Sequence, residues 1–204
     1  MGYYYYLAPQ LYHLVYGQEA PMSSAAFIAL AHETMSQADA ALLDFCTLDP
    51  DPVKEEENAG PQEVKPTVPK NDGPSYAMPA PPTHSEFINR WREWERSLRL
   101  NLARNRAVKL RWEASVDAPE YPADAVLAAK NAMTIESPLE AELFLDKARW
   151  DAIESFQGIN IFSESAMYAY LLKLLLLERK ADFDMEEGFT EYKALYTAIL
   201  GEYK

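Results

Sequence analysis

The sequence predicts a mainly α-helical protein, a bundle of antiparallel helices that includes one long central helix. Apolar residues recur with the 3.6-residue helical period over several long segments, most clearly over residues 85–112. Helix-start patterns precede such segments, as in Ser137-Pro138-Leu139-Glu140, which combines a capping box with Pro at the first helical position. Apolar residues make up 49% of the chain, which is ordinary for a globular protein with a hydrophobic core.

Residues 1–48 are predicted to form an N-terminal unit with an aromatic start and two helices. The run from Tyr3 to Tyr6 indicates a short strand or an extended segment, because Tyr suits half-buried pleated surfaces. Ser23 or the next serine can cap a helix that runs to about residue 35. Ser36, with an aspartate three positions later, can cap a second helix over 38–46.

Residues 49–83 are predicted to be a flexible, disordered linker rich in proline and glutamate. Proline fixes φ and removes backbone donors, and the segment also holds Glu55-Glu56-Glu57 and few large apolar side chains. A proline-rich ligand for a partner domain is the alternative interpretation. In either case the segment separates the N-terminal unit from a helical domain over residues 84–204.

The long central helix is predicted over residues 85–112, where the apolar residues fall on one stripe at 100° per residue. That stripe consists of Phe87, Trp91, Trp94, Leu98, Leu102 and Trp112. The arginines lie mostly off it: Arg90, Arg92, Arg96, Arg99, Arg104, Arg106 and Arg111. Such a helix would be roughly 40 Å long, at about 1.5 Å per residue.

The rest of the chain predicts an alanine-rich helix and then a module of three helices over 137–200. Pro122 opens the first of these helices, which runs to about residue 133. In the module, helices are expected over 137–156, 163–180 and 184–200, and their short connections make neighbours antiparallel. The helix over 163–180 is apolar on nearly all sides, so we expect it to be buried between other helices.

Charge is unevenly distributed along this acidic chain, whose formal net charge is −13. Residues 1–83 carry a net −8, residues 84–113 a net +4 and residues 114–204 a net −9. An acidic chain is repelled by phosphate, so we expect no nucleic-acid binding and no attraction to an anionic membrane surface. The basic segment either pairs with its acidic neighbours within the chain or presents a basic face to an acidic partner protein.

The residues that usually carry chemistry do not form a recognisable site, so we expect no enzyme, cofactor or metal. His13, His32 and His84 lack the spacing of a helical metal pair, and no glycine-rich phosphate loop is present. Cys46, the single cysteine, is expected to be a buried thiol. No disulfide within the chain, no signal peptide and no apolar run of about 18 residues are found, which favours the cytoplasm.

Asp146 stands out among the carboxylates, because it falls inside an apolar stripe with Leu139, Leu143, Trp150 and Ile153. A carboxylate that faces a core needs a partner or a raised pKa. We expect a structural bond to an Arg, a Lys or a helix N-terminus. The alternative, a catalytic acid in a small hydrolase, would need a second polar group near Asp146.

Several segments resemble a known family. LEAELFLDKARW (139–150) and LLLERK (175–180) resemble the helical module of the C-type subunit of V/A-type ATP synthases, whose eukaryotic V-ATPase equivalent is the d-type subunit. Four further segments resemble an uncharacterised bacterial family encoded in V-type ATP synthase operons: YYYYL (3–7), LVYGQEAPMS (14–23), WREWERSLR (91–99) and LARNRA (102–107). The chain differs from the C-type subunit in being shorter and in carrying the linker.

The resemblance implies a mechanical function without catalysis. Proteins of the C type couple the central stalk to the membrane rotor ring, so stalk and ring subunits would be the partners and the protein would lie peripheral to the inner membrane. Under this interpretation, acidic loops of those subunits would contact a set of basic side chains: Arg90, Arg92, Arg96, Arg99 and Arg104. The rival hypothesis is a free-standing helical adaptor that binds a partner peptide or helix.

Overall fold

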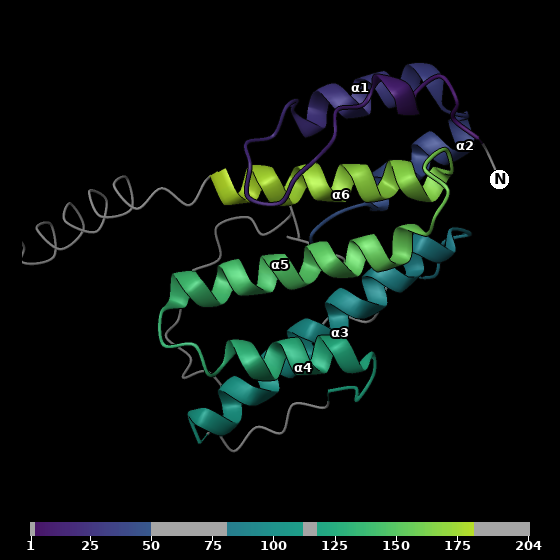
Figure 1. Ribbon diagram of the computed structural model, residues 1–204. Coiled ribbons are helices and arrows are strands. Elements are labelled where there is room, and N and C mark those ends of the chain that lie inside the picture. Colours follow the sequence, from purple (N-terminus) through teal and green to yellow (C-terminus); the bar gives the residue numbers. More distant parts are fainter. Residues whose placement is uncertain (1–2, 50–80, 112–117, 182–204) are drawn as a thin grey trace, which may run out of the picture.

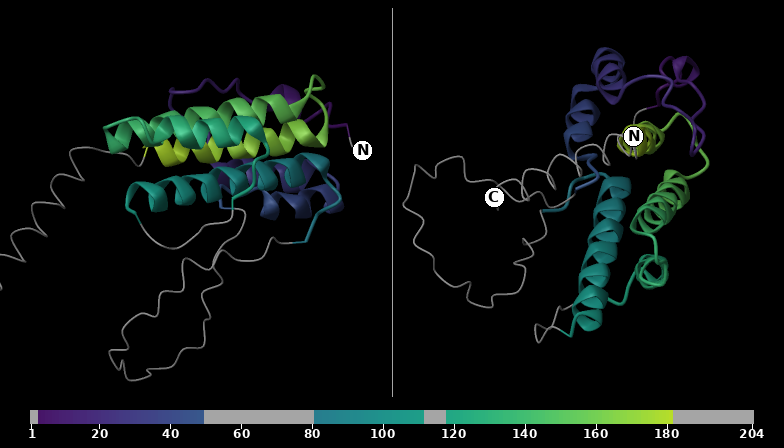
Figure 2. Two further views of the ribbon diagram at one scale, coloured as in Figure 1. Left: turned by 90° about the horizontal axis from the view of Figure 1, so that it is seen from below. Right: turned by 90° about the vertical axis from the view of Figure 1, so that its left-hand side faces the viewer.

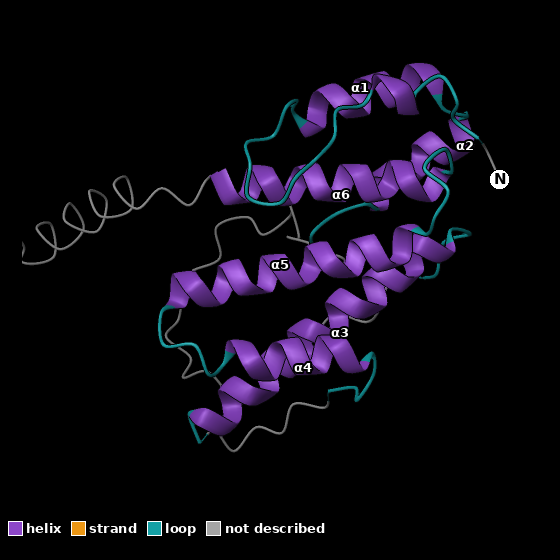
Figure 3. Cartoon of the chain, viewed as in Figure 1, coloured by secondary structure: helices purple, strands orange, loops and turns teal. Residues whose placement is uncertain are grey.

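The computed structural model describes residues 3–49, 81–111 and 118–181, and these residues form a helical bundle (Figures 1 and 3). The α-helices are α1 (Ser24–Thr34), α2 (Gln37–Ala40), α3 (Glu86–Lys109), α4 (Ala123–Ala132), α5 (Pro138–Gln157) and α6 (Glu164–Ala181). Two 3-10 helices span Ala8–Gln10 and Ala41–Phe45. The prediction of a mainly α-helical fold is confirmed. Most of the predicted linker (50–80) and the helix expected over 184–200 lie outside the described residues.

The N-terminal aromatic run does not form a strand. Tyr3 makes one isolated antiparallel bridge with Ser163, and the backbone N–H of Tyr4 donates to the carbonyl of Phe162 at 2.7 Å. From Tyr5 onward the chain turns into the first 3-10 helix. Tyr4, within the run, and Leu7, directly after it, are buried. Their spacing of three is that of a helical turn, whereas a half-buried strand needs alternation.

Serine caps begin the helices at the positions expected from the sequence. Ser23, Ser85 and Ser137 each accept a hydrogen bond from the backbone N–H three positions later, at the starts of α1, α3 and α5. The helix expected over 38–46 instead tightens after Ala40 into the second 3-10 helix, a common ending for short helices.

The long helix α3 is about 36 Å long, at about 1.5 Å per residue over its 24 residues. It ends at Lys109, because Arg111 adopts φ 55°, the left-handed conformation that terminates many helices. The apolar stripe of α3 faces the core, with Trp91, Trp94 and Leu98 almost fully buried. Trp112, which we expected to complete this stripe, lies outside the described residues.

Helices α5 and α6 run antiparallel, joined by a loop at one end, while α3 crosses them obliquely (Figures 1 and 2). Helix α4 packs on α3 and α5, and α1 packs on α6. One hydrophobic core joins these helices, with buried residues from both sides of segment 50–80, such as Phe27 of α1 and Trp91 of α3. Helix α6 is buried on most sides, as predicted. None of the helices in the described ranges is long and apolar enough to cross a membrane.

Candidate functional site

A network of charged side chains lies inside the bundle, and Asp146 is part of it. Asp146 of α5 has no exposed surface. Its Oδ1 accepts a hydrogen bond from Nη1 of Arg149, one helical turn later, at 2.9 Å, so an arginine supplies the structural bond. Its Oδ2 is also buried and has no hydrogen-bond partner among the described residues.

Arg149 extends the network from α5 to α3. Its Nε and Nη2 donate to the two carboxylate oxygens of Glu95 at 2.9 and 3.0 Å. Glu95 is fully buried and also accepts from Nε of Arg99 at 2.9 Å. Bidentate pairing of this kind is among the strongest hydrogen-bonded arrangements in proteins. The network therefore fixes the position of α5 on α3.

Arg179, in the last turn of α6, joins the same network. One of its terminal nitrogens lies 3.7 Å from Oδ1 of Asp146, and the other donates to Glu142 at 3.2 Å. A terminal nitrogen of Arg106 on α3 lies 4.0 Å from the same Glu142. The ends of α3, α5 and α6 are thus linked by alternating charges.

The pKa values of the central pair reflect burial and mutual attraction. Burial raises the pKa of Asp146, and the positive charges of Arg179 and Arg149 offset only part of this effect. Burial alone would lower the pKa of Arg149, but Glu95 and Asp146 together raise it above its usual value. Arg149 therefore remains charged at all ordinary pH values.

Little in this interior resembles a reaction centre. The carboxyl group of Asp146 is enclosed, whereas the hydrolase alternative would require it to face an open cleft. In the three described ranges, no group of three or more His, Cys, Asp and Glu side chains is arranged to hold a metal ion. Burial raises the pKa of the Cys46 thiol well above its usual value, which disfavours the nucleophilic thiolate.

The five arginines proposed as partner contacts differ in their surroundings. Arg99 is held within the chain, by Glu95 and by Asp49 and the carbonyl of Leu48 at 2.9 and 2.6 Å. Arg92 donates to the carbonyl of Pro81 at 3.2 Å, and Arg96 is half-buried. Arg90 and Arg104 are the exposed members, and the guanidinium of Arg90 lies 4.8 Å from the ring centre of Phe156. Part of the basic segment therefore pairs internally.

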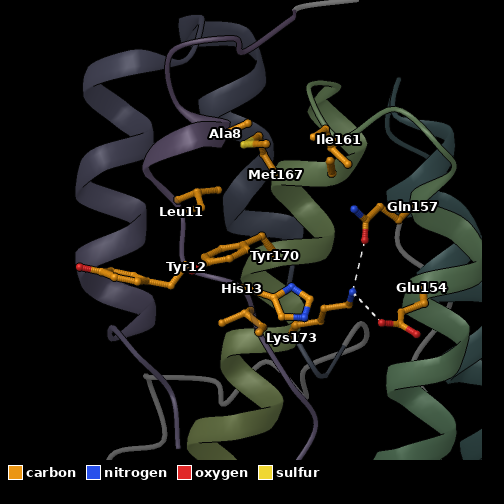
Figure 4. A pocket seen from close by; sticks show the side chains of 12 residues that line it. Ala8, Leu11, Tyr12, His13, Glu154, Gln157, Ile161, Met167, Tyr170 and Lys173 are labelled. Carbon is orange, nitrogen blue, oxygen red and sulfur yellow. Dashed lines mark hydrogen bonds and ion pairs between the residues drawn. The ribbon is translucent and has the colours of Figure 1, made fainter. Parts of the chain in front are cut away.

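A separate pocket of about 380 Å³ lies between the N-terminal segment, the end of α5 and the first half of α6 (Figure 4). Its apolar lining includes Leu11, Leu14 and Met167. At one end Lys173 contacts Glu154 and Gln157, as the dashed lines in Figure 4 show. The full lining is Ala8, Leu11, Tyr12, His13, Leu14, Glu154, Gln157, Ile161, Ala166, Met167, Tyr170 and Lys173.

Sequence reasoning identified Asp146 but missed its partners and the pocket. The apolar stripes in the sequence did contain a sign of the network, because a charged residue lies within each of two stripes. Glu95 follows Trp91 by four positions and precedes Leu98 by three, so it lies on the same buried stripe. Arg149 lies three positions after Asp146 and four before Ile153, in the corresponding place on α5. A charged residue in each of two apolar stripes suggests a buried pair, whereas the pocket depends on packing between distant segments.

Comparisons with protein families, with curated proteins and with solved structures found no match to this chain.

Proposed function

We propose that the protein is a non-catalytic subunit or accessory factor of a bacterial V-type ATP synthase, where it couples the central stalk to the membrane rotor ring in the manner of the C-type subunit. It would be cytoplasmic and peripheral to the inner membrane through that complex. Its partners would be stalk and rotor-ring subunits.

One observation carries the proposal: three of the segments that resemble ATP synthase-associated proteins contact one another through the buried charges. WREWERSLR (91–99) contributes Glu95 from α3, and LEAELFLDKARW (139–150) contributes Asp146 and Arg149 from α5. LLLERK (175–180) contributes Arg179 from α6. Because hydrogen-bonded charges and a shared core join these segments, they should move as one rigid body. Transmitting torque requires such a body, and it requires no catalytic residues.

Within this proposal, the exposed arginines of α3 are the candidate contacts for acidic loops of the stalk or ring. Arg90 and Arg104 lie at the surface, and Arg92 and Arg96 are half-buried. Arg99 is mainly a structural residue in this arrangement, because Glu95 and Asp49 already pair with it. Charge reversal at Arg90 and Arg104 would therefore affect partner binding and leave the buried contacts among Glu95, Arg149 and Asp146 in place.

The experiment is co-purification of the tagged full chain with V-type ATP synthase subunits from cells that produce both. We expect Arg90→Glu combined with Arg104→Glu to reduce the recovered ATP synthase subunits about tenfold or more, because two like-charge contacts would replace two attractive ones. Lys130→Glu, a charge reversal at an exposed site on α4, is the matched control and should leave recovery unchanged. Circular dichroism should be the same for all variants. Failure of the wild-type chain to co-purify with any ATP synthase subunit would refute the proposal.

A further inference from the structure

The C-terminal end of α3 carries positive charge that nearby carboxylates do not balance. Residues 96–111 hold six Lys and Arg and no Asp or Glu. Arg106, Lys109 and Arg111, at the end of this stretch, are exposed. Arg106 lies 4.0 Å from Glu142 of α5, and neither Lys109 nor Arg111 forms an ion pair with a residue that the structure describes. This end of the helix therefore attracts an acidic group.

Apolar side chains lie beside these charges. Leu110 follows Arg106 by four positions on α3, and Leu139 precedes Glu142 by three on α5, so each lies one helical turn from the contact between Arg106 and Glu142. Leu110 is 59% exposed and Leu139 is half-buried. Together these side chains form what we call the α3-terminus surface: Arg106, Lys109, Leu110, Arg111 and Leu139.

The end of α6 lies next to this surface. Arg179 of α6 and Arg106 of α3 contact the two carboxylate oxygens of the same residue, Glu142. Figure 1 shows the yellow end of α6 on the same side of the bundle as the start of α5. The structure describes α6 as far as Ala181, so residues 182–204 continue the chain from a point only two positions beyond Arg179.

The sequence of residues 182–204 complements the α3-terminus surface. Its first ten residues, 182–191, hold five Asp and Glu and no Lys or Arg. In the helix that the sequence predicts over 184–200, four apolar side chains fall on one stripe at 100° per residue: Phe189, Tyr192, Tyr196 and Ile199. A segment tethered next to its binding site has an effective concentration of about millimolar, so weak contacts are enough to hold it. A separate partner protein has no such advantage.

We propose that residues 182–204 bind to the α3-terminus surface of their own chain. The carboxylates of 182–191 contact the cations of this surface, and the apolar stripe packs on its two leucines. Arg104, a candidate contact for the ATP synthase, lies two positions before Arg106 and so points about 160° away from it around the helix axis. The inference goes beyond the assignment to an ATP synthase and does not depend on it.

The first stage of the test is zero-length cross-linking of the purified full chain with a carbodiimide, which joins a lysine directly to a carboxylate in contact with it. Mass spectrometry should find Lys109 linked to a carboxylate of residues 182–191. The control is Arg90→Lys, which places a lysine at an exposed site about 28 Å away along α3 and should give no link to that segment. No link from Lys109, or equal links from both positions, overturns the proposal.

An equal mixture of ordinary and ¹⁵N-labelled chains identifies which copy supplies the segment. Linked peptides in which both parts carry the same isotope show that the segment binds its own chain, as proposed. Linked pairs that combine the two isotopes at the frequency expected for random exchange would place the segment of a second copy on the surface, and would overturn binding within one chain.

The second stage measures hydrogen exchange of residues 189–200 in the intact protein by mass spectrometry. Lys109→Glu combined with Arg111→Glu should speed this exchange about fivefold or more, because it replaces two attractions by two repulsions. Adding Glu186→Lys and Glu187→Lys to that variant should restore the slow exchange. Arg90→Glu, the same reversal elsewhere on α3, should stay within about twofold. Unchanged exchange in the first variant, or no recovery after the second pair of changes, overturns the proposal.

Discussion

Arg149 of α5 donates two hydrogen bonds to the carboxylate of Glu95, which lies 54 positions earlier in α3. Only 4% of Arg149 and none of Glu95 is exposed, so hydrogen bonds between the two side chains replace those that each would make with water. Each group now depends on its partner, because an uncompensated charge in such a place is costly. This dependence and the neighbouring helix ends lead to four predictions about stability.

Replacing Arg149 with methionine should lower the free energy of unfolding by about 3–5 kcal/mol, because the buried Glu95 would keep only Arg99 and the buried Asp146 only the more distant Arg179. Urea denaturation followed by circular dichroism measures the change. Arg104→Met, at an exposed position of α3, is the control and should change stability by less than about 0.5 kcal/mol. Equal effects of the two substitutions would show that the buried pair contributes no more to the free energy of unfolding than an exposed arginine does.

Asp146 should give the stability an unusual dependence on pH. Because its pKa is raised in the folded state, the unfolded chain loses this proton first as the pH rises. The stability of the wild type relative to Asp146→Asn should therefore fall as pH rises above about 4, by at most about 1.4 kcal/mol per pH unit. Urea titrations of both proteins at a series of pH values measure the difference. A difference that grows with pH would mean that Arg149 and Arg179 lower the pKa instead.

Ser137→Ala should destabilise the protein by about 1 kcal/mol, because the side chain of Ser137 accepts from the backbone N–H of Glu140 at the start of α5. Thermal and urea unfolding both report the change. Ser137→Asp keeps an acceptor at the cap and should retain most of the wild-type stability. A loss of equal size in both variants would contradict a capping role.

Gly158→Ala should cost about 1–3 kcal/mol, and the cost should come from the backbone. Gly158 ends α5 with φ 74° and ψ −170°, a combination open essentially to glycine alone. No atom of the described residues lies within 4 Å of the position that a Cβ would take, so steric contact is not the cause. The urea midpoint should fall while the slope of the transition stays unchanged. An unchanged midpoint would mean that the loop after α5 adapts freely.

The sequence predicted individual helices well where local signals define them. The capping box at Ser137 and the glycine at position 158 mark the ends of α5, and the all-round apolar pattern of α6 predicted its burial. Local signals say which face of a helix is buried, not which helix it meets. The pairing of Glu95 with Arg149 therefore appears only in three dimensions, since it joins residues far apart in the chain.

The N-terminal segment shows a different limit. A run of four tyrosines suits a strand by propensity, but the burial of Tyr4 and Leu7 against the bundle selects a turn. The pocket could not be predicted either, because it arises where residues near the N-terminus meet the end of α5 and the start of α6. Contacts of this kind depend on the whole packing arrangement and leave no periodic pattern.

Two arginines of α3 have a consequence for the segment between residues 49 and 81. Arg99 holds the carbonyl of Leu48, and Arg92, seven positions earlier on the helix, holds that of Pro81. Seven helical residues correspond to about 10 Å between the backbones of the two arginines. The 31 residues 50–80 connect the two segments that these arginines hold. One helix, α3, thus holds both ends of this connection, so a change in the position of α3 would move both ends together.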